Sequence, residues 1–220
     1  VFSNIQKTIQ YLLSANTAEV LCIFLATLFG WDVLDPVHLL WINLVTDTLP
    51  AIALGVEPAE PGVMQHKPRG RNSSFFSGGV MSSIIYQGIL QAALVLGVYG
   101  FALFFPEHST YEEIHADALT MSYLTLGLIQ LVHAFNVKSV YQSIFTVGPF
   151  KNRLFNWSIV AAFLLLMATI VIPGFNTFFH VTHLSVTQWL VAIIGSGLMI
   201  VIVEIVKFVQ RKMGLDEKAI

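Results

Sequence analysis

The chain has 220 residues, of which 55% are hydrophobic and only 11% are charged. Soluble domains carry roughly 25% charged residues, so this composition excludes an ordinary soluble domain and indicates that lipid is the main solvent. The formal net charge of −2 gives no reason to expect a nucleic-acid partner, because such binding needs a basic face.

Six apolar runs are long enough to cross a bilayer, for which a helix needs about 20 residues. In chain order the runs extend over residues 9–29, 37–56, 80–105, 118–137, 155–173 and 188–208. The sequence therefore predicts an all-α membrane protein with six transmembrane helices, surrounded by the lipid bilayer.

The basic residues predict the orientation of these helices, since Lys and Arg remain on the cytoplasmic side of short loops. All 11 of them lie before the first span, after the sixth, or in the connections that follow the second and fourth spans. The other connections, residues 30–36, 106–117 and 174–187, contain none. We expect the acids of these connections to form a solvated face. Both termini are therefore expected to be cytoplasmic.

Two acidic residues lie inside the predicted spans, where a charged group demands a partner. Glu19 is in the first span and Asp47 in the second, and no Lys or Arg falls in the middle of any span. Either these carboxyl groups are protonated or a cation lies between them.

Helical spacing groups further oxygen-bearing side chains with the two acids. Asn16 precedes Glu19 by three residues, so the two share one face of the first helix. Asn43, Thr46 and Asp47 share one face of the second helix in the same way. Carboxylate, amide and hydroxyl oxygens are the ligands that hard cations prefer. The sequence therefore predicts a cation site, and no buried cluster of sulfur and imidazole suggests zinc or copper.

Pro50 breaks the second helix beside these residues. Proline lacks an N–H, and its ring collides with the carbonyl four residues earlier, which here belongs to Thr46. Transporters use such broken helices to place backbone oxygens on a cation inside the membrane. The alternative is a kink, in which a protonated Asp47 forms a hydrogen bond to a neighbouring helix.

The fourth span contributes a third polar face, on which Gln130, His133 and Asn136 recur at helical spacing. Amides in membrane helices more often bridge helices than hold ions. Spacing alone therefore leaves Gln130 open to both roles.

Two motifs resemble P-type calcium ATPases of the sarco/endoplasmic-reticulum type. The stretch Leu40–Ala51, LWINLVTDTLPA, looks like their sixth transmembrane helix, and Tyr11–Val20, YLLSANTAEV, resembles their fifth. Met64, Pro68 and Arg69 are similar to the cytoplasmic loop that leads to their seventh helix.

The resemblance implies a domain organisation and a function. Residues 1–220 are then the C-terminal transmembrane cation-transport domain, with the fifth to tenth helices, of a translocase that exports Ca²⁺ from the cytoplasm. The chain has no Asp-Lys-Thr-Gly-Thr phosphorylation motif, so Mg²⁺ and ATP serve cytoplasmic domains that are absent from it. Those domains and the remaining transmembrane helices of the pump are its expected partners, and residues 57–77 form an expected contact with the phosphorylated cytoplasmic domain.

The resemblance also implies a set of ligands. Five residues match positions that coordinate Ca²⁺ in that family, namely Asn16, Glu19, Asn43, Thr46 and Asp47. Gln130 matches a further ligand position on the eighth helix, where reticulum-type pumps have a glutamate. This departure removes one negative charge and therefore bears on whether one or two ions bind.

Other functions remain open on the residues alone. Half of a secondary transporter also uses broken helices, and a subunit that only assembles other membrane proteins would keep Glu19 and Asp47 protonated as contacts between helices. Na⁺ and Mn²⁺ are the alternatives to Ca²⁺, because oxygen ligands alone do not fix charge or size. The C-terminal Asp216–Ile220 contains no reticulum-retention signal, which favours the plasma membrane.

Overall fold

The computed structural model describes residues 2–58 and 74–215. Most of the predicted contact loop, with Met64, Pro68 and Arg69, and the C-terminal Asp216–Ile220 lie outside these residues. Within the described ranges every regular element is a helix, and six helical segments are long and apolar enough to cross a membrane. The predicted all-α fold with six membrane helices is therefore confirmed.

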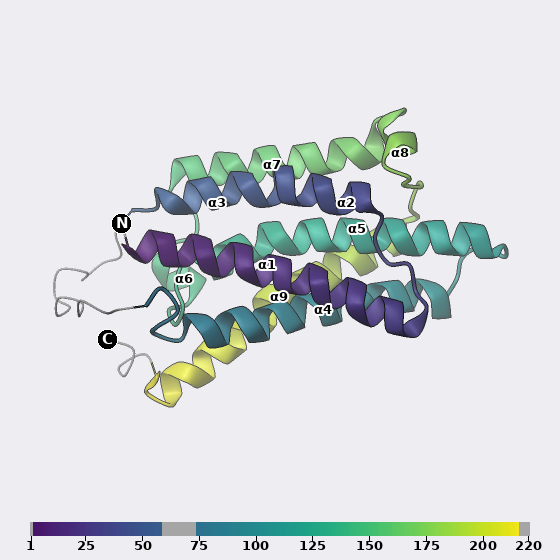
Figure 1. Ribbon diagram of the computed structural model, residues 1–220. Coiled ribbons are helices and arrows are strands. Elements are labelled where there is room, and N and C mark those ends of the chain that lie inside the picture. Colours follow the sequence, from purple (N-terminus) through teal and green to yellow (C-terminus); the bar gives the residue numbers. More distant parts are fainter. Residues whose placement is uncertain (1, 59–73, 216–220) are drawn as a thin grey trace.

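The spans follow the chain in the predicted order, with two short helices between the later ones. They are α1 (Phe2–Phe29), the combined α2 (Pro36–Trp41), η1 (Ile42–Asp47) and α3 (Thr48–Gly55), then α4 (Val80–Phe104), α5 (Tyr111–Asn136), α7 (Arg153–Val171) and α9 (Val186–Lys212). The short helices are α6 (Ile144–Val147) and α8 (Phe175–Phe178). The first turn of α1 and the last turn of α9 lie at the same end of the bundle (Figure 1). The cytoplasmic location of that end stays a prediction.

Helix α5 is the central helix of the bundle. In its most apolar stretch 83% of the residues are buried, against 28% in the corresponding stretches of α7 and α9. Helices α4, α7 and α9 and the η1 turn all pack against it, while α3 runs beside α7 (Figure 1). Side chains on α5 are therefore enclosed by protein, which makes it the natural helix on which to place polar groups inside the membrane.

The connection from α1 to α2 fixes where the second span starts. Gly30 follows the end of α1 with a φ of 67°, a left-handed conformation that glycine adopts without steric cost. Asp35 then caps α2, because its carboxylate accepts a hydrogen bond from the Val37 N–H at 3.1 Å. The His38 ring accepts the Asp35 N–H at 3.2 Å and completes a capping box. This start sets the position of the η1 turn that follows.

The fourth span begins earlier than predicted. Residues 106–117 were expected to be a loop, but α5 starts at Tyr111. Glu112 and Glu113 lie in its first turn, where the partial positive charge of a helix N-terminus favours acidic side chains. Hydropathy alone misses this turn because its residues are polar.

The predicted solvated acidic face is wrong for one of its members. Asp117 is only 4% exposed. It accepts hydrogen bonds from Gln188 Nε2 at 2.7 Å, from Thr182 Oγ1 at 3.1 Å, and shares one with His108 Nδ1 at 2.8 Å. Gln188 and Thr182 come from distant parts of the chain, so the burial of Asp117 could not be read from the local sequence.

Candidate cation site

Two carboxyl groups lie buried on facing helices. Glu19 on α1 is 7% exposed and Asp47 at the end of η1 is 1% exposed. The two groups are near enough for their charges to interact. Within residues 2–58 and 74–215, no Lys or Arg forms an ion pair with either carboxylate.

Asn43 joins the two helices directly. Its Nδ2 donates to Glu19 Oε2 at 2.8 Å and to the Leu39 carbonyl at 2.9 Å. The polar face that spacing predicts on the second span therefore meets the polar face of α1 at Glu19.

The second span changes its helical form where these residues lie. Over Ile42–Asp47 it widens into a π-helical turn before α3 begins, and Pro50 follows within α3. The Thr46 carbonyl, which Pro50 deprives of its intrahelical donor, accepts a hydrogen bond from the Tyr11 hydroxyl at 3.3 Å. The proline-containing second helix is therefore confirmed, and its irregularity is a π-helical turn, a form frequent at functional sites.

Several oxygens of this region are buried and accept no hydrogen bond. Among the described residues they include Glu19 Oε1, Thr46 Oγ1, both carboxylate oxygens of Asp47, and Gln130 Oε1. A buried polar group without a partner costs free energy, more so when it is charged. Oxygens of this kind suit a hard cation, which would supply the missing partner.

Gln130 and Asn16 differ in how they relate to these oxygens. Gln130 is fully buried on α5, which packs against η1, and neither atom of its amide has a hydrogen-bond partner in the described chain. Asn16 is exposed on α1. The structure thus buries Gln130 on a helix that contacts η1, but leaves Asn16 exposed on α1.

Two buried aromatic side chains, Tyr11 and His133, form contacts near the second span that the sequence did not indicate. The Tyr11 hydroxyl donates to the Thr46 carbonyl, one residue before Asp47, at 3.3 Å. His133 Nε2 lies 2.7 Å from Ser14 Oγ, and its ring stacks on Tyr11 with 5.9 Å between centroids. A tyrosine inside a membrane helix was the available signal, because a buried hydroxyl needs a hydrogen-bond partner.

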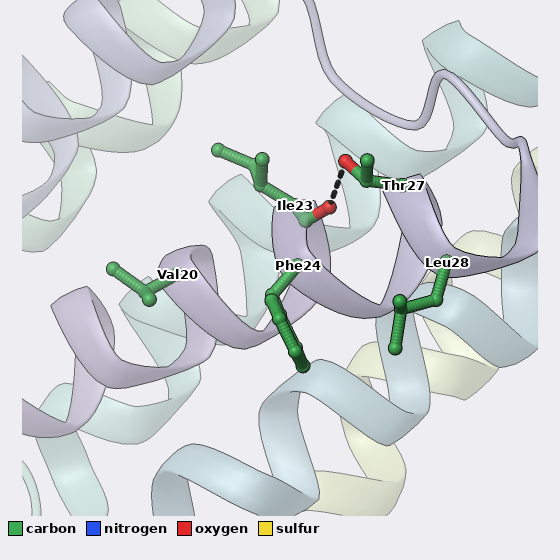
Figure 2. A pocket seen from close by; sticks show the side chains of 5 residues that line it. All are labelled: Val20, Ile23, Phe24, Thr27 and Leu28. Carbon is green, nitrogen blue, oxygen red and sulfur yellow. Dashed lines mark hydrogen bonds between the residues drawn. The ribbon is translucent and has the colours of Figure 1, made fainter.

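A shallow depression further along α1 has a different character. Figure 2 shows its lining, which consists of Val20, Ile23, Phe24, Thr27 and Leu28, all from this one helix. The Thr27 hydroxyl donates to the carbonyl of Ile23 at 2.7 Å and so offers nothing to a ligand. This apolar surface suits lipid or another helix and is not part of the cation site.

The described residues contain no group of three or more His, Cys, Asp or Glu side chains that could hold a metal ion. A site here must therefore depend on amide, hydroxyl and carbonyl oxygens in addition to the two carboxylates. That composition fits a hard cation and not zinc or copper.

Comparison with known proteins gives a consistent set of relatives. Residues 32–209 match the family model described as "Cation transporting ATPase, C-terminus". The sequence is 37% identical to Calcium-transporting ATPase 1 of Bacillus cereus, over 96% of this chain and 25% of that protein. It is 35% identical to a calcium-transporting ATPase of Listeria monocytogenes, over 96% of this chain and 23% of that protein. An endoplasmic reticulum calcium ATPase of Aspergillus fumigatus is 30% identical over 97% of this chain and 25% of its own length. The chain thus spans about a quarter of the length of these relatives.

Proposed function

Because the chain belongs to the cation-transporting ATPase family as its C-terminal part, we propose that it is the cation-binding membrane portion of an ATP-driven P-type pump that exports Ca²⁺ from the cytoplasm. The observation that carries this proposal is the group of buried oxygens without partners on Glu19, Thr46, Asp47 and Gln130. The relatives are named calcium-transporting ATPases, which supports Ca²⁺ over Na⁺ and Mn²⁺.

The two carboxylates explain why a divalent cation would bind. Removing an ion from water costs several kcal/mol even after relaxation, and neither Glu19 nor Asp47 has a basic partner in the described chain. A Ca²⁺ ion between them would neutralise both negative charges at once. It takes about six to eight oxygen ligands at about 2.3–2.6 Å, more than two carboxylates supply.

Neutral oxygens would complete the set. Thr46 Oγ1 and Gln130 Oε1 are buried and free to coordinate. Asn43 would contribute its amide oxygen, since its Nδ2 already points to Glu19. Asn16 faces outward, and we assign it to the side of the ion that other helices of the pump would cover.

The same observations favour a pump site over the alternatives. In a subunit that only assembles other proteins, a protonated Asp47 would donate a hydrogen bond, yet both of its oxygens lack a partner in the described residues. Half of a secondary transporter would share the helix irregularity, but the family is one of ATPases. ATP and Mg²⁺ would be used by cytoplasmic domains of the longer protein.

The chain is a multi-pass membrane protein. We place it in the cell membrane, because two of the similar calcium-transporting ATPases come from bacteria, which have no reticulum. An endoplasmic reticulum relative in Aspergillus makes the reticulum the alternative location.

Ca²⁺ binding to the intact pump, measured for the wild type and for Asp47→Asn, tests the proposal. Loss of one carboxylate ligand should weaken binding at least about tenfold, which is about 1.4 kcal/mol. Asp32→Asn is the matched control, because Asp32 is an exposed acid in the connection before the second span. Unchanged affinity in Asp47→Asn would overturn the proposal.

A further inference from the structure

A further buried acid lies just beyond the end of α3, the last part of the second span. Glu57 follows the last residue of α3 by two positions and is 8% exposed. Its Oε1 lies 3.1 Å from Lys138 Nζ, and its Oε2 accepts a hydrogen bond from Asn152 Nδ2 at 2.7 Å. Unlike Asp47, this carboxylate has a partner on each oxygen, so it needs no cation.

The partners of Glu57 belong to three other parts of the bundle. Lys138 follows the end of α5, Asn152 caps the start of α7, and Asn4 on α1 donates to the Glu57 carbonyl at 2.7 Å. Asn152 Nδ2 also reaches the Ala53 carbonyl of α3 at 3.4 Å. The end of α3 is thereby tied to α1, α5 and α7 at one point.

Lys138 depends on this pairing. Its side chain is fully buried, its Nζ donates to the Pro149 carbonyl at 2.8 Å, and it lies 4.0 Å from the centroid of the Phe155 ring. Burial lowers the pKa of Lys138 below its ordinary value, although the Glu57 carboxylate opposes the shift. Without the Glu57 carboxylate, the buried Lys138 would carry an uncompensated charge, which destabilises the folded protein.

Packed side chains connect the Glu57–Lys138 pair to the cation site. Phe155 packs in one apolar cluster with Leu54 and Tyr11. The Tyr11 hydroxyl in turn bonds the Thr46 carbonyl in the π-helical turn. A rigid helix of eight residues, α3, joins the same turn to Glu57. Both routes fix the place of Asp47 relative to α1 and α5.

We infer that the Glu57–Lys138 ion pair, with Asn152, is a latch that holds the ligand-bearing second span in register with α5 and α7 and so sets the affinity of the cation site. Glu57 and Lys138 are positioning residues in this inference, which rests on the proposed function. The latch touches no ion ligand. It acts by holding the ligand oxygens at the distances from the ion that Ca²⁺ requires, which are about 2.3–2.6 Å.

The test uses the intact pump and four variants: Glu57→Gln, Lys138→Met, the double variant, and Lys151→Met. The readouts are the Ca²⁺ concentration for half-maximal ATPase activity and the turnover at saturating Ca²⁺. Each single change should raise the half-maximal Ca²⁺ concentration about tenfold, while saturating turnover stays within about twofold, because Ca²⁺ at high concentration restores the bound geometry. The exposed Lys151 lies in the same connection as Lys138, and its variant should resemble the wild type.

The double variant separates positioning from loss of folding. It leaves neither charge unpaired, so it should be more stable than either single variant and should recover part of the lost Ca²⁺ affinity. If single variants do not fold, the double variant still decides the question, since its affinity should lie below that of the wild type. Wild-type affinity in folded variants, with only the unfolding temperature lowered, would overturn the inference.

Asp47→Asn, run in the same assay, distinguishes this inference from the proposed function. If Asp47→Asn weakens Ca²⁺ dependence and the Glu57 variants do not, the latch alone is wrong. If Asp47→Asn also has no effect, the cation site itself is wrong, and the latch falls with it.

Discussion

Replacing Gly88 by alanine perturbs the packing of α4 against α1, the helix that carries Glu19. A Cβ at Gly88 on α4 would lie 2.7 Å from Thr17 Cγ2, 2.8 Å from Thr17 Cβ and 3.2 Å from the Ser14 carbonyl oxygen on α1. Carbon atoms in favourable contact are about 3.5–4.0 Å apart. Rotation of Thr17 cannot relieve a clash with its own Cβ, so α1 must move by roughly 0.7 Å.

Two opposing terms set the size of the effect. Inside a helix, alanine is more stabilising than glycine by about 1 kcal/mol. Overpacking lowers the stability of the fold by about 1–3 kcal/mol. Gly97 on the same helix is the matched control, because a Cβ there would meet nothing within 4 Å. Gly88→Ala should therefore be less stable than Gly97→Ala by about 1–3 kcal/mol, and the shift of α1 should also weaken Ca²⁺ binding through Glu19.

Thermal unfolding of the intact pump in detergent micelles, together with Ca²⁺ binding, measures both effects. For a 220-residue unit, 1 kcal/mol corresponds to about 2–4 °C, so the unfolding transition of this membrane domain should lie several degrees lower in the Gly88 variant than in the Gly97 variant. If Gly88→Ala were as stable as Gly97→Ala and bound Ca²⁺ like the wild type, the close packing of α1 on α4 would not be positioning Glu19.

Three further changes test separate features. Tyr11→Phe leaves the Thr46 carbonyl without its donor and should cost about 1–3 kcal/mol in Ca²⁺-free unfolding; an unchanged unfolding temperature would contradict this. The hydrogen bond with Asp117 and its negative charge raise the pKa of His108 above its ordinary 6.5, so the stabilisation by this ion pair is fully present below pH 6.5 and is lost as pH rises through the raised pKa. NMR titration should show a lower His108 midpoint in Asp117→Asn, and an unchanged midpoint would exclude the contact. Gln130→Glu adds a third buried acid, so the rise in unfolding temperature on adding Ca²⁺ should exceed that of the wild type; an equal rise would place Gln130 outside the site.

The sequence predicts the helices well because hydropathy and length are local properties. It predicts their polar ends less well, since Tyr111 begins α5 within residues that read as a loop. Asp117 was misassigned for a related reason, because Gln188 and Thr182 cover it from positions far along the chain.

In the candidate site, too, local spacing could be predicted from the sequence and contacts between helices could not. Spacing places Asn16 and Glu19 on one face of α1, but residues three apart still differ in direction by about 60° on a helix with 3.6 residues per turn. In the folded bundle Glu19 is 7% exposed and accepts a hydrogen bond from Asn43, while Asn16 is exposed. Which neighbour a face meets depends on how helices rotate against one another, and that is set by packing over the whole chain.

Pro50 illustrates what spacing can and cannot give. Its position predicts that the Thr46 carbonyl loses the donor that residue 50 would otherwise supply. That the Tyr11 hydroxyl bonds this carbonyl could not be predicted, because the two residues belong to different helices.

Direct observation of the ion in the Ca²⁺-loaded intact pump tests the cation site most sharply. An anomalous-diffraction map should show one ion with carboxylate oxygens of both Glu19 and Asp47 at about 2.3–2.6 Å. An ion bound elsewhere, or the two acids joined by a direct hydrogen bond with no ion between them, would contradict the account.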